Sequence, residues 1–154
     1  MILIDTSGLL AAIDASERLH RAAAATLRAA EAPRSISPFV LAELDYLLTT
    51  RVSQDSARRL LREVVDGAYR FETFDSADLA MAGEIMDRYR DLNLGLADAS
   101  ILVLADRYGT RDILTLDERH FRAVRDARGR PFRILPADAG ASVPFIMENS
   151  SAYG

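Results

Sequence analysis

Short apolar runs that alternate with helix-like segments constrain the fold of this chain more than any other feature. Strands are predicted at 1–5, 34–37, 70–74, 112–116 and 131–135. Helices are predicted at 7–14, 17–31, 38–51, 54–67, 76–91, 97–108 and 118–124. Because parallel strands need long crossover connections, usually helices, this alternation favours a mostly parallel sheet covered on both faces. The expected architecture is therefore three-layer α/β/α, with about five short strands in the centre.

Several predicted boundaries carry capping signals. Ser37 is followed by Pro38, which suits an N-cap followed by proline in the first helical position. Ser53 can cap the next helix, and Gly67 and Gly109 can end helices. The alternation stops near Pro136, so we expect one domain over 1–136 and a loosely held tail over 137–154.

Composition excludes several kinds of protein. The chain has no cysteine, so disulfides, thiolate metal sites and thiol nucleophiles are ruled out. All 19 basic residues are arginine, so mechanisms that need a lysine are ruled out as well. No apolar run approaches the roughly 20 residues that span a bilayer, and no secretory signal is visible. We therefore expect a cytoplasmic protein that is not embedded in a membrane.

Four acidic residues stand where strands end or within helices: Asp5, Glu43, Asp98 and Asp117. Each has an ordinary structural alternative, since aspartates often cap helices or lie in a first helical turn. Glu43 is harder to explain in that way, because it falls beside or within an apolar helical face. In contrast, Asp45 is expected to point to solvent.

The joint arrangement of the acids points to a cation. In open α/β sheets, ligands bind at the carboxyl ends of the strands. Two carboxylates about 5 Å apart repel by roughly 3 kcal/mol at an effective dielectric constant near 20. A hard divalent ion such as Mg²⁺, or Mn²⁺, relieves this repulsion and prepares a site for phosphodiester hydrolysis.

Four short motifs then resemble those of the PIN-domain nucleases, specifically the VapC-type toxins of bacterial toxin–antitoxin pairs. The likeness extends from about residue 1 to residue 136. In order, the motifs are Ile4-Asp5-Thr6-Ser7, Ser37-Pro38-Phe39-Val40-Leu41-Ala42-Glu43-Leu44, Gly95-Leu96-Ala97-Asp98-Ala99, and Leu114-Thr115-Leu116-Asp117 followed by His120-Phe121. Each motif is weak alone, whereas four in this order and spacing are specific.

The resemblance implies a Mg²⁺-dependent endoribonuclease toxin that cleaves structured RNA, either tRNA or ribosomal RNA. Its metal-site acids are expected to be Asp5, Glu43, Asp98 and Asp117, with Thr6 and Thr115 as supporting hydroxyls. It also implies a homodimer, and inhibition by a cognate antitoxin that is a small DNA-binding protein with a flexible tail. Helices within 39–65 carry more apolar side chains than one sheet face needs; the alternative, at equal odds, is that these side chains belong to the core.

Other kinds of protein fit less well. A phosphoacceptor domain or a haloacid-dehalogenase type of phosphatase needs a lysine and a second nearby acid, which the chain lacks after Asp5. A serine hydrolase would have to use His20 or His120, and neither lies near a Gly-x-Ser-x-Gly turn; both are expected at the surface. The remaining alternative is a catalytically silent PIN domain that binds RNA or protein. Arginines near the site, several of them within 119–133, are expected to select the RNA.

Overall fold

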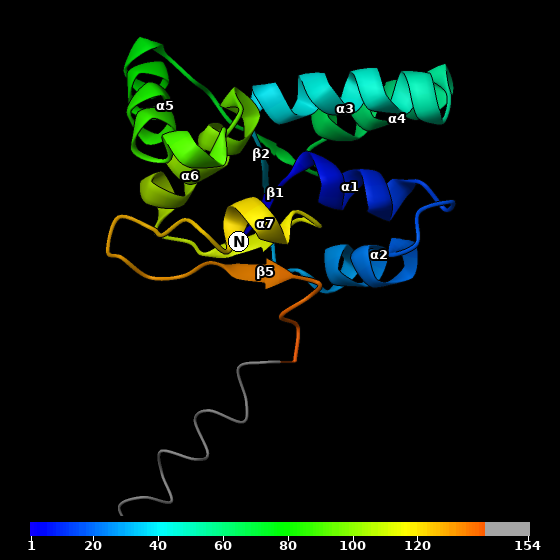
Figure 1. The fold of residues 1–154 in the computed structure, drawn as a ribbon. Coiled ribbons are helices and arrows are strands. Elements are labelled where there is room, and N and C mark those ends of the chain that lie inside the picture. Colours follow the sequence, from blue (N-terminus) through cyan, green and yellow to red (C-terminus); the bar gives the residue numbers. More distant parts are fainter. Residues whose placement is uncertain (141–154) are drawn as a thin grey trace, which may run out of the picture.

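Five short strands form one parallel sheet in the order β3-β2-β1-β4-β5, which confirms the predicted sheet (Figure 1). The structure is a computed structural model and describes residues 1–140. The strands are β1 (Ile2–Ile4), β2 (Arg34–Ile36), β3 (Arg70–Phe71), β4 (Asp112–Leu114) and β5 (Arg133–Leu135). Ile4 pairs with Leu114, so β1 and β4 end at the same edge of the sheet. The residues that follow them are Asp5 and Thr115.

Helices cover the sheet in a three-layer α/β/α arrangement (Figure 1). They are α1 (Thr6–Ile13), α2 (His20–Ala29), α3 (Pro38–Arg51), α4 (Gln54–Val65), α5 (Ser76–Arg88), α6 (Leu96–Tyr108) and α7 (Glu118–Phe121). All three residues of β1 are at most 2% exposed, as expected for a central strand that is covered on both faces. Among the described residues, no helix is long and apolar enough to cross a membrane.

The predicted helix starts at Ser37 and Ser53 are confirmed. The Ser37 hydroxyl accepts hydrogen bonds from the backbone N–H groups of Phe39 and Val40, and Ser53 accepts one from Ser56. Buried Ser37 also bonds through its Oγ to Ser100 Oγ of α6, at 2.7 Å. Two helices that carry predicted site acids, α3 and α6, are thereby joined by a buried serine pair.

Several predicted boundaries differ from the structure, including that of the strand expected over 70–74, which ends at Phe71. The helix expected over 17–31 begins only at His20, and the one expected over 76–91 ends at Arg88. A 3-10 turn, Arg90–Leu92, follows, and Asn93 then takes a left-handed backbone conformation (φ 53°) that stops further helix. The predicted tail over 137–154 lies for the most part outside the described residues.

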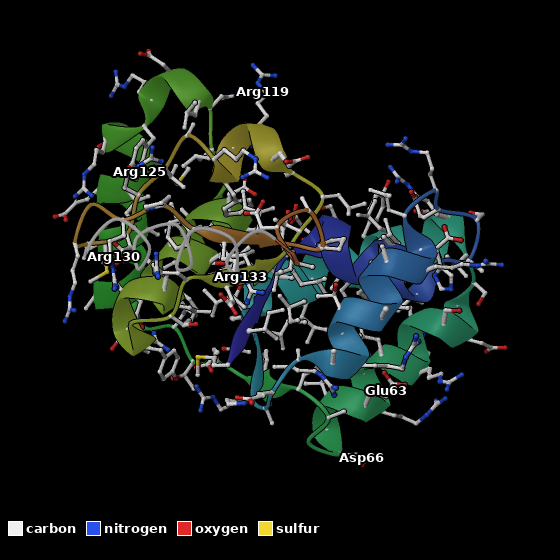
Figure 2. The ribbon with its side chains drawn as sticks, turned by 90° about the horizontal axis from the view of Figure 1, so that it is seen from below. Glu63, Asp66, Arg119, Arg125, Arg130 and Arg133 are labelled. Atoms are coloured by element: carbon white, nitrogen blue, oxygen red, sulfur yellow. The ribbon has the colours of Figure 1, made fainter. Side chains whose placement is uncertain are left out.

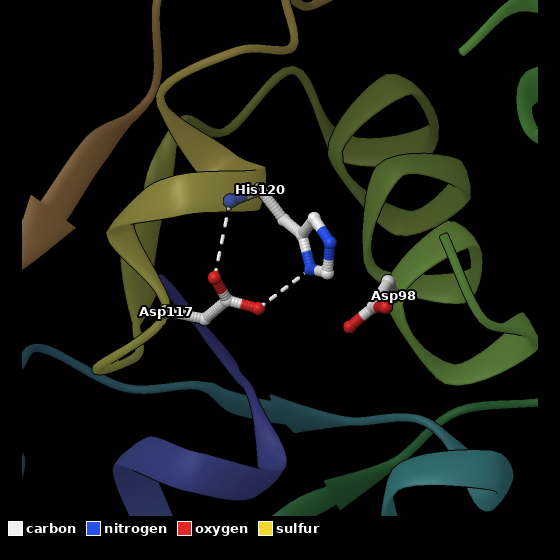
Figure 3. Close-up of side chains that lie close together, drawn as sticks. All are labelled: Asp98, Asp117 and His120. Carbon is white, nitrogen blue, oxygen red and sulfur yellow. Dashed lines mark hydrogen bonds and ion pairs between the residues drawn. The ribbon is translucent and has the colours of Figure 1, made fainter. Parts of the chain in front are cut away.

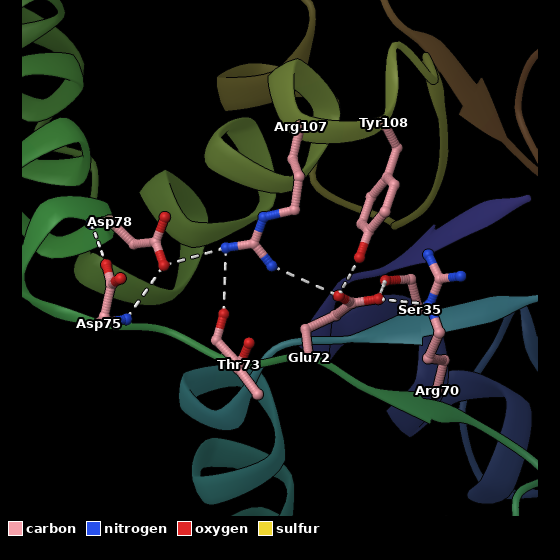
Figure 4. Close-up of polar contacts among 8 residues, drawn as sticks. All are labelled: Ser35, Arg70, Glu72, Thr73, Asp75, Asp78, Arg107 and Tyr108. Carbon is pink, nitrogen blue, oxygen red and sulfur yellow. Dashed lines mark hydrogen bonds and ion pairs between the residues drawn. The ribbon is translucent and has the colours of Figure 1, made fainter.

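A buried carboxylate ties strand β3 to helix α6 (Figure 4). Glu72, 4% exposed, accepts hydrogen bonds from Ser35, Arg70 and Tyr108 at 2.5–2.7 Å, and Arg107 lies 3.4 Å away. Burial acts to raise the pKa of Glu72, but the bonds from Ser35, Tyr108 and Arg70 outweigh it and hold this pKa below its usual value. The network therefore fixes a two-residue edge strand that has little pairing of its own.

Candidate active site

Asp5 lies at the carboxyl end of β1, where the sequence predicted a site acid. Its backbone N–H donates to Leu114 O at 3.0 Å, which extends the β1–β4 pairing by one residue. Its side chain is only 4% exposed, and Oδ2 accepts hydrogen bonds from Thr115 Oγ1 at 2.6 Å and Ser7 Oγ at 2.9 Å. The carboxylate is thus held from both sides by hydroxyls of two different segments.

Helix α1 approaches β4 so closely that only glycine fits at one position. A Cβ added to Gly8 would lie 2.3 Å from the backbone oxygen of Leu114. This close packing lets Ser7 Oγ accept a hydrogen bond from the backbone N–H of Leu116 at 3.0 Å. The loop after β4, which carries Thr115 and Asp117, is therefore tied to the first turn of α1.

Burial has a large effect on the ionisation of Asp5. Desolvation raises the pKa of Asp5 to about 6, although the hydrogen bonds from Thr115 and Ser7 act in the opposite direction. The negative charge of Asp98 raises this pKa further, which shows that the two carboxylates lie within electrostatic reach of each other. Without a nearby cation, the ionised form of Asp5 is costly.

Asp98, Asp117 and His120 form a compact cluster (Figure 3). One potential ligand atom of each lies within 4.8 Å of the others. Asp117 Oδ1 accepts a hydrogen bond from the backbone N–H of His120 at 3.0 Å, and Oδ2 lies 2.7 Å from His120 Nδ1. The turn of α7 thus places the imidazole against Asp117 and toward Asp98.

The position of Asp98 in the first turn of α6 sets its environment. Its Oδ2 accepts a hydrogen bond from the backbone N–H of Gly95 at 3.1 Å. Asp98 therefore also stabilises the start of α6, which was its predicted structural alternative. Burial nevertheless raises the pKa of Asp98, and the charge of Asp117 adds to this; the Gly95 N–H and His120 oppose it. A structural role and a site role therefore coexist in one residue.

Glu43 lies beside the apolar face of α3, one of the two placements that the sequence predicted. The residue is exposed, because Val40, Leu44 and Leu48 form the buried face of α3 and Glu43 lies beside that face. Its carboxylate is still fixed, since Thr6 Oγ1 donates a hydrogen bond to Glu43 Oε1 at 2.9 Å. Asp45 is exposed, as expected.

Of the four predicted acids, the structure brings Asp98 and Asp117 together in one cluster with His120. Asp5 and Glu43 lie outside that cluster: Asp5 is within electrostatic reach of Asp98, and Glu43 is connected through Thr6, the neighbour of Asp5. Sequence reasoning missed His120 as a member of the cluster and expected a surface residue. Its spacing of three residues from Asp117, one helical turn, was the available signal. It also missed Ser7 as a supporting hydroxyl, although Ser7 directly follows Thr6.

The residues present fit a divalent metal ion. The cluster offers carboxylate oxygens and one imidazole nitrogen, and buried Asp5 with its raised pKa indicates a negative site that a cation would relieve. Carboxylates suit Mg²⁺ and Mn²⁺, whereas imidazole suits the transition metals. The structure therefore contains a carboxylate cluster able to bind a metal.

A parallel α/β/α fold with acids gathered at the strand ends defines a class of metal-dependent nucleases, and comparison with known proteins agrees with that class. Residues 2–127 match the PIN domain family, so the chain belongs to this family. It is 44% identical over 135 residues to Ribonuclease VapC26 of Mycobacterium tuberculosis, which covers 88% of this chain and 100% of that relative. The chain is thus a VapC-type PIN ribonuclease.

Two solved structures share the fold. Mycobacterium tuberculosis VapC20, described as a Sarcin-Ricin loop cleaving toxin, matches with a TM-score of 0.72 and 20% identity, covering 77% of this chain and 92% of that one. The toxin–antitoxin complex VapBC2 of Rickettsia felis, bound to a DNA fragment from its promoter, matches with a TM-score of 0.60 and 17% identity. That match covers 87% of this chain and 98% of the other.

Proposed function

We propose that this ribonuclease is a toxin that hydrolyses phosphodiester bonds of structured RNA, with Mg²⁺ or Mn²⁺ held by Asp98 and Asp117 beside Asp5. The convergence of Asp98, Asp117 and His120 within 4.8 Å, next to a buried fourth group, is the observation that carries the proposal. A bound divalent ion would lower the pKa of a water molecule and neutralise charge on the attacked phosphate.

The protein's own residues prepare this chemistry. Thr115 and Ser7 fix the Asp5 carboxylate, and Thr6 fixes that of Glu43. Because Glu43 is exposed, its carboxylate can orient the attacking water or contact the ion. His120 is held by Asp117 and either adds a ligand or positions that carboxylate. Direct ligation by His120 would favour Mn²⁺, whereas positioning alone would leave a site suited to Mg²⁺.

Sequencing of RNA ends after induced expression would identify the substrate. We expect new 5′ ends in one structured RNA, a tRNA or a ribosomal RNA, because the relatives include a toxin described as cleaving the Sarcin-Ricin loop. Cells that express an Asp98→Ala variant should show none of these ends. Identical RNA ends from the two strains would contradict the proposal.

Arg119 is the arginine of the 119–133 cluster best placed to contact RNA. Arg122 pairs with Glu118 and Asp138, Arg130 with Asp126, and Arg133 with Asp112, while Arg125 donates to backbone oxygens. Among the described residues, only Arg119 and Arg128 of this cluster have no hydrogen-bond or ion-pair partner for their side chains. Figure 2 shows Arg119 extended away from the ribbon, and it lies on α7 between Asp117 and His120.

We therefore expect Arg119→Ala to weaken RNA binding and to lower the slope of log affinity against log salt by about 1, the share of one phosphate contact. Arg128→Ala is the matched control and should leave the slope closer to that of the wild type. Fluorescence anisotropy at several salt concentrations measures both. Equal slopes for wild type and Arg119→Ala would remove Arg119 from the RNA surface.

An antitoxin partner and a homodimer complete the proposal. Val40, Leu44, Leu48 and Leu60 are core residues, but Leu61 and Val65 of α4 are 37% and 85% exposed and can contact a second copy. The antitoxin is proposed to insert an arginine- or lysine-bearing segment among the acids, since guanidinium pairs well with carboxylates. Raised Mg²⁺ should then weaken inhibition; inhibition that is independent of Mg²⁺ would place the antitoxin elsewhere.

A further inference from the structure

A small apolar groove opens directly beside the acids. Its volume is about 320 Å³, near the lower end for ligand pockets. One wall comes from the start of α2, and the other comes from the residues after β4 and β5; the lining residues are Leu19, Ala22, Thr115, Leu116, Glu118, Pro136 and Ala137. Thr115 belongs to the groove and also donates its hydroxyl proton to Asp5. Glu118, another lining residue, directly follows Asp117, so the groove adjoins the segment that carries two of the proposed site contacts.

The surroundings of the groove suit a nucleotide. Leu19 is 37% exposed and Ala22 is exposed, so the apolar wall is open to a ligand. Exposed arginines Arg18 and Arg21 directly precede these two residues, and Arg119 directly follows Glu118. None of the three has an ion-pair or hydrogen-bond partner for its side chain within residues 1–140. Apolar walls flanked by unpaired cations match a base that lies between charged phosphates.

Glu118, at the rim of the groove, has one carboxylate oxygen that can accept a hydrogen bond from a ligand. Glu118 accepts two hydrogen bonds from Arg122, from Nε at 2.8 Å and from Nη2 at 2.6 Å, and both go to Oε1. Its Oε2 has no hydrogen-bond donor among the described residues, and the side chain is 54% exposed. A carboxylate oxygen in this state can accept a hydrogen bond from the exocyclic amino group of a base.

We propose that this groove is a nucleobase subsite: it receives one unstacked base of the RNA, close to the cleaved phosphate, and favours a base with an amino group over uracil. The proposal rests on the ribonuclease function given above. A groove of about 320 Å³ can hold a single unstacked base but is too small for a base-paired segment. Single-stranded loops, whose bases can be splayed out, are the usual targets of sequence-specific RNA recognition.

Two exposed alanines on one helix provide the test. Ala22→Trp fills the groove, whereas Ala25→Trp changes an equally exposed residue of α2 that lines a separate pocket. Both purified variants would be assayed on an RNA library with randomised single-stranded positions, and the ends would be sequenced. Ala22→Leu serves as a milder second variant, because leucine is smaller than tryptophan and has a higher helix propensity.

We expect the wild type and Ala25→Trp to prefer an amino-bearing base at one fixed position relative to the cut. Ala22→Trp should lose that preference and raise KM roughly tenfold or more, as a blocked apolar pocket does. Ala22→Leu should give a smaller change in the same direction. Metal affinity and Tm should stay close to those of Ala25→Trp, since neither alanine contacts the acids.

The proposal is wrong if Ala22→Trp keeps the base preference and the KM of the wild type. It is equally wrong if cleavage is unchanged but inhibition by the antitoxin is lost, because the groove would then hold a protein segment. Asp5→Asn serves as the inactive reference. Absence of cleavage by the wild type itself would instead contradict the ribonuclease function, so the two failures are distinguishable.

Discussion

Asp5→Asn should strongly reduce RNA cleavage and at the same time stabilise the metal-free protein. Asp5 is nearly fully buried, and its pKa rises from 3.8 in the unfolded chain to about 6 in the folded protein. The folded state therefore holds this proton more tightly, and stability decreases as pH rises from about 4 to about 6. Above pH 6, ionisation of Asp5 therefore costs about 3 kcal/mol of the free energy of unfolding. A neutral asparagine does not ionise and avoids this cost.

The expected gain in the free energy of unfolding is about 1–3 kcal/mol at pH 7.5 in EDTA. The lower end of this range reflects the N–H groups of the new amide, which need a hydrogen-bond acceptor. The gain should shrink as pH falls from 6 to 4. Mg²⁺ should stabilise the wild type and leave Asp5→Asn unchanged, and cleavage should fall at least about 100-fold. Asp45→Asn, an exposed change on α3, is the control and should alter neither property. Denaturant unfolding measures the gain, and a less stable Asp5→Asn would contradict this account.

Glu72→Ala should be the most destabilising single change far from the acids. It removes the acceptor shared by Ser35, Arg70 and Tyr108 and leaves the fully buried hydroxyl of Ser35 unpaired. Loss of a buried, multiply bonded carboxylate is expected to cost about 2–4 kcal/mol of the free energy of unfolding. Because the pKa of Glu72 is lowered on folding, its stabilisation is present at neutral pH and is lost as pH falls below its usual value near 4.5.

Glu63→Ala is the matched control. Its pair with Arg59 is also between a glutamate and an arginine, but the two side chains are 39% and 77% exposed, so we expect a change of about 0.5 kcal/mol or less. Well below its Tm, Glu72→Ala should still cleave RNA. Arg107 and Tyr108 lie at the end of α6 opposite to Asp98, about 15 Å along the helix axis. Equal stability of the two variants would show that the Glu72 network contributes little.

The sequence was sufficient for features set by local pattern. The existence and order of the five strands, the Ser37-Pro38 helix start and the places of Asp5, Asp98 and Asp117 along these elements follow from short-range signals, and the structure agrees with them. For Glu43 the helical pattern left two placements open, beside or within the apolar face, because the choice depends on the angle between Glu43 and the buried residues Val40, Leu44 and Leu48 around α3. A rotation of about 100° per residue separates a buried position from the next one along the chain.

Other features could not be predicted from the sequence, because they depend on contacts between residues that are distant along the chain. Ser35, Glu72 and Tyr108 come from three elements more than 30 residues apart, so no local pattern predicts that they meet. His120 joins the cluster because α7 packs where Asp98 of α6 is also directed. Helix α5 ends at Arg88, and the 3-10 turn after it ends at Asn93 in a left-handed conformation; the polar helical pattern of this segment predicted neither.

Cleavage by the purified protein, with and without chelation, tests the central claim most directly. Wild-type protein would be incubated with its identified RNA in Mg²⁺, in excess EDTA, and in EDTA followed by excess Mg²⁺ or Mn²⁺. We expect cleavage in the first, none in the second, and recovery in the third, while Asp98→Ala stays inactive throughout. Cleavage that persists in excess EDTA, or that Asp98→Ala retains in full, would contradict a metal site built from these acids.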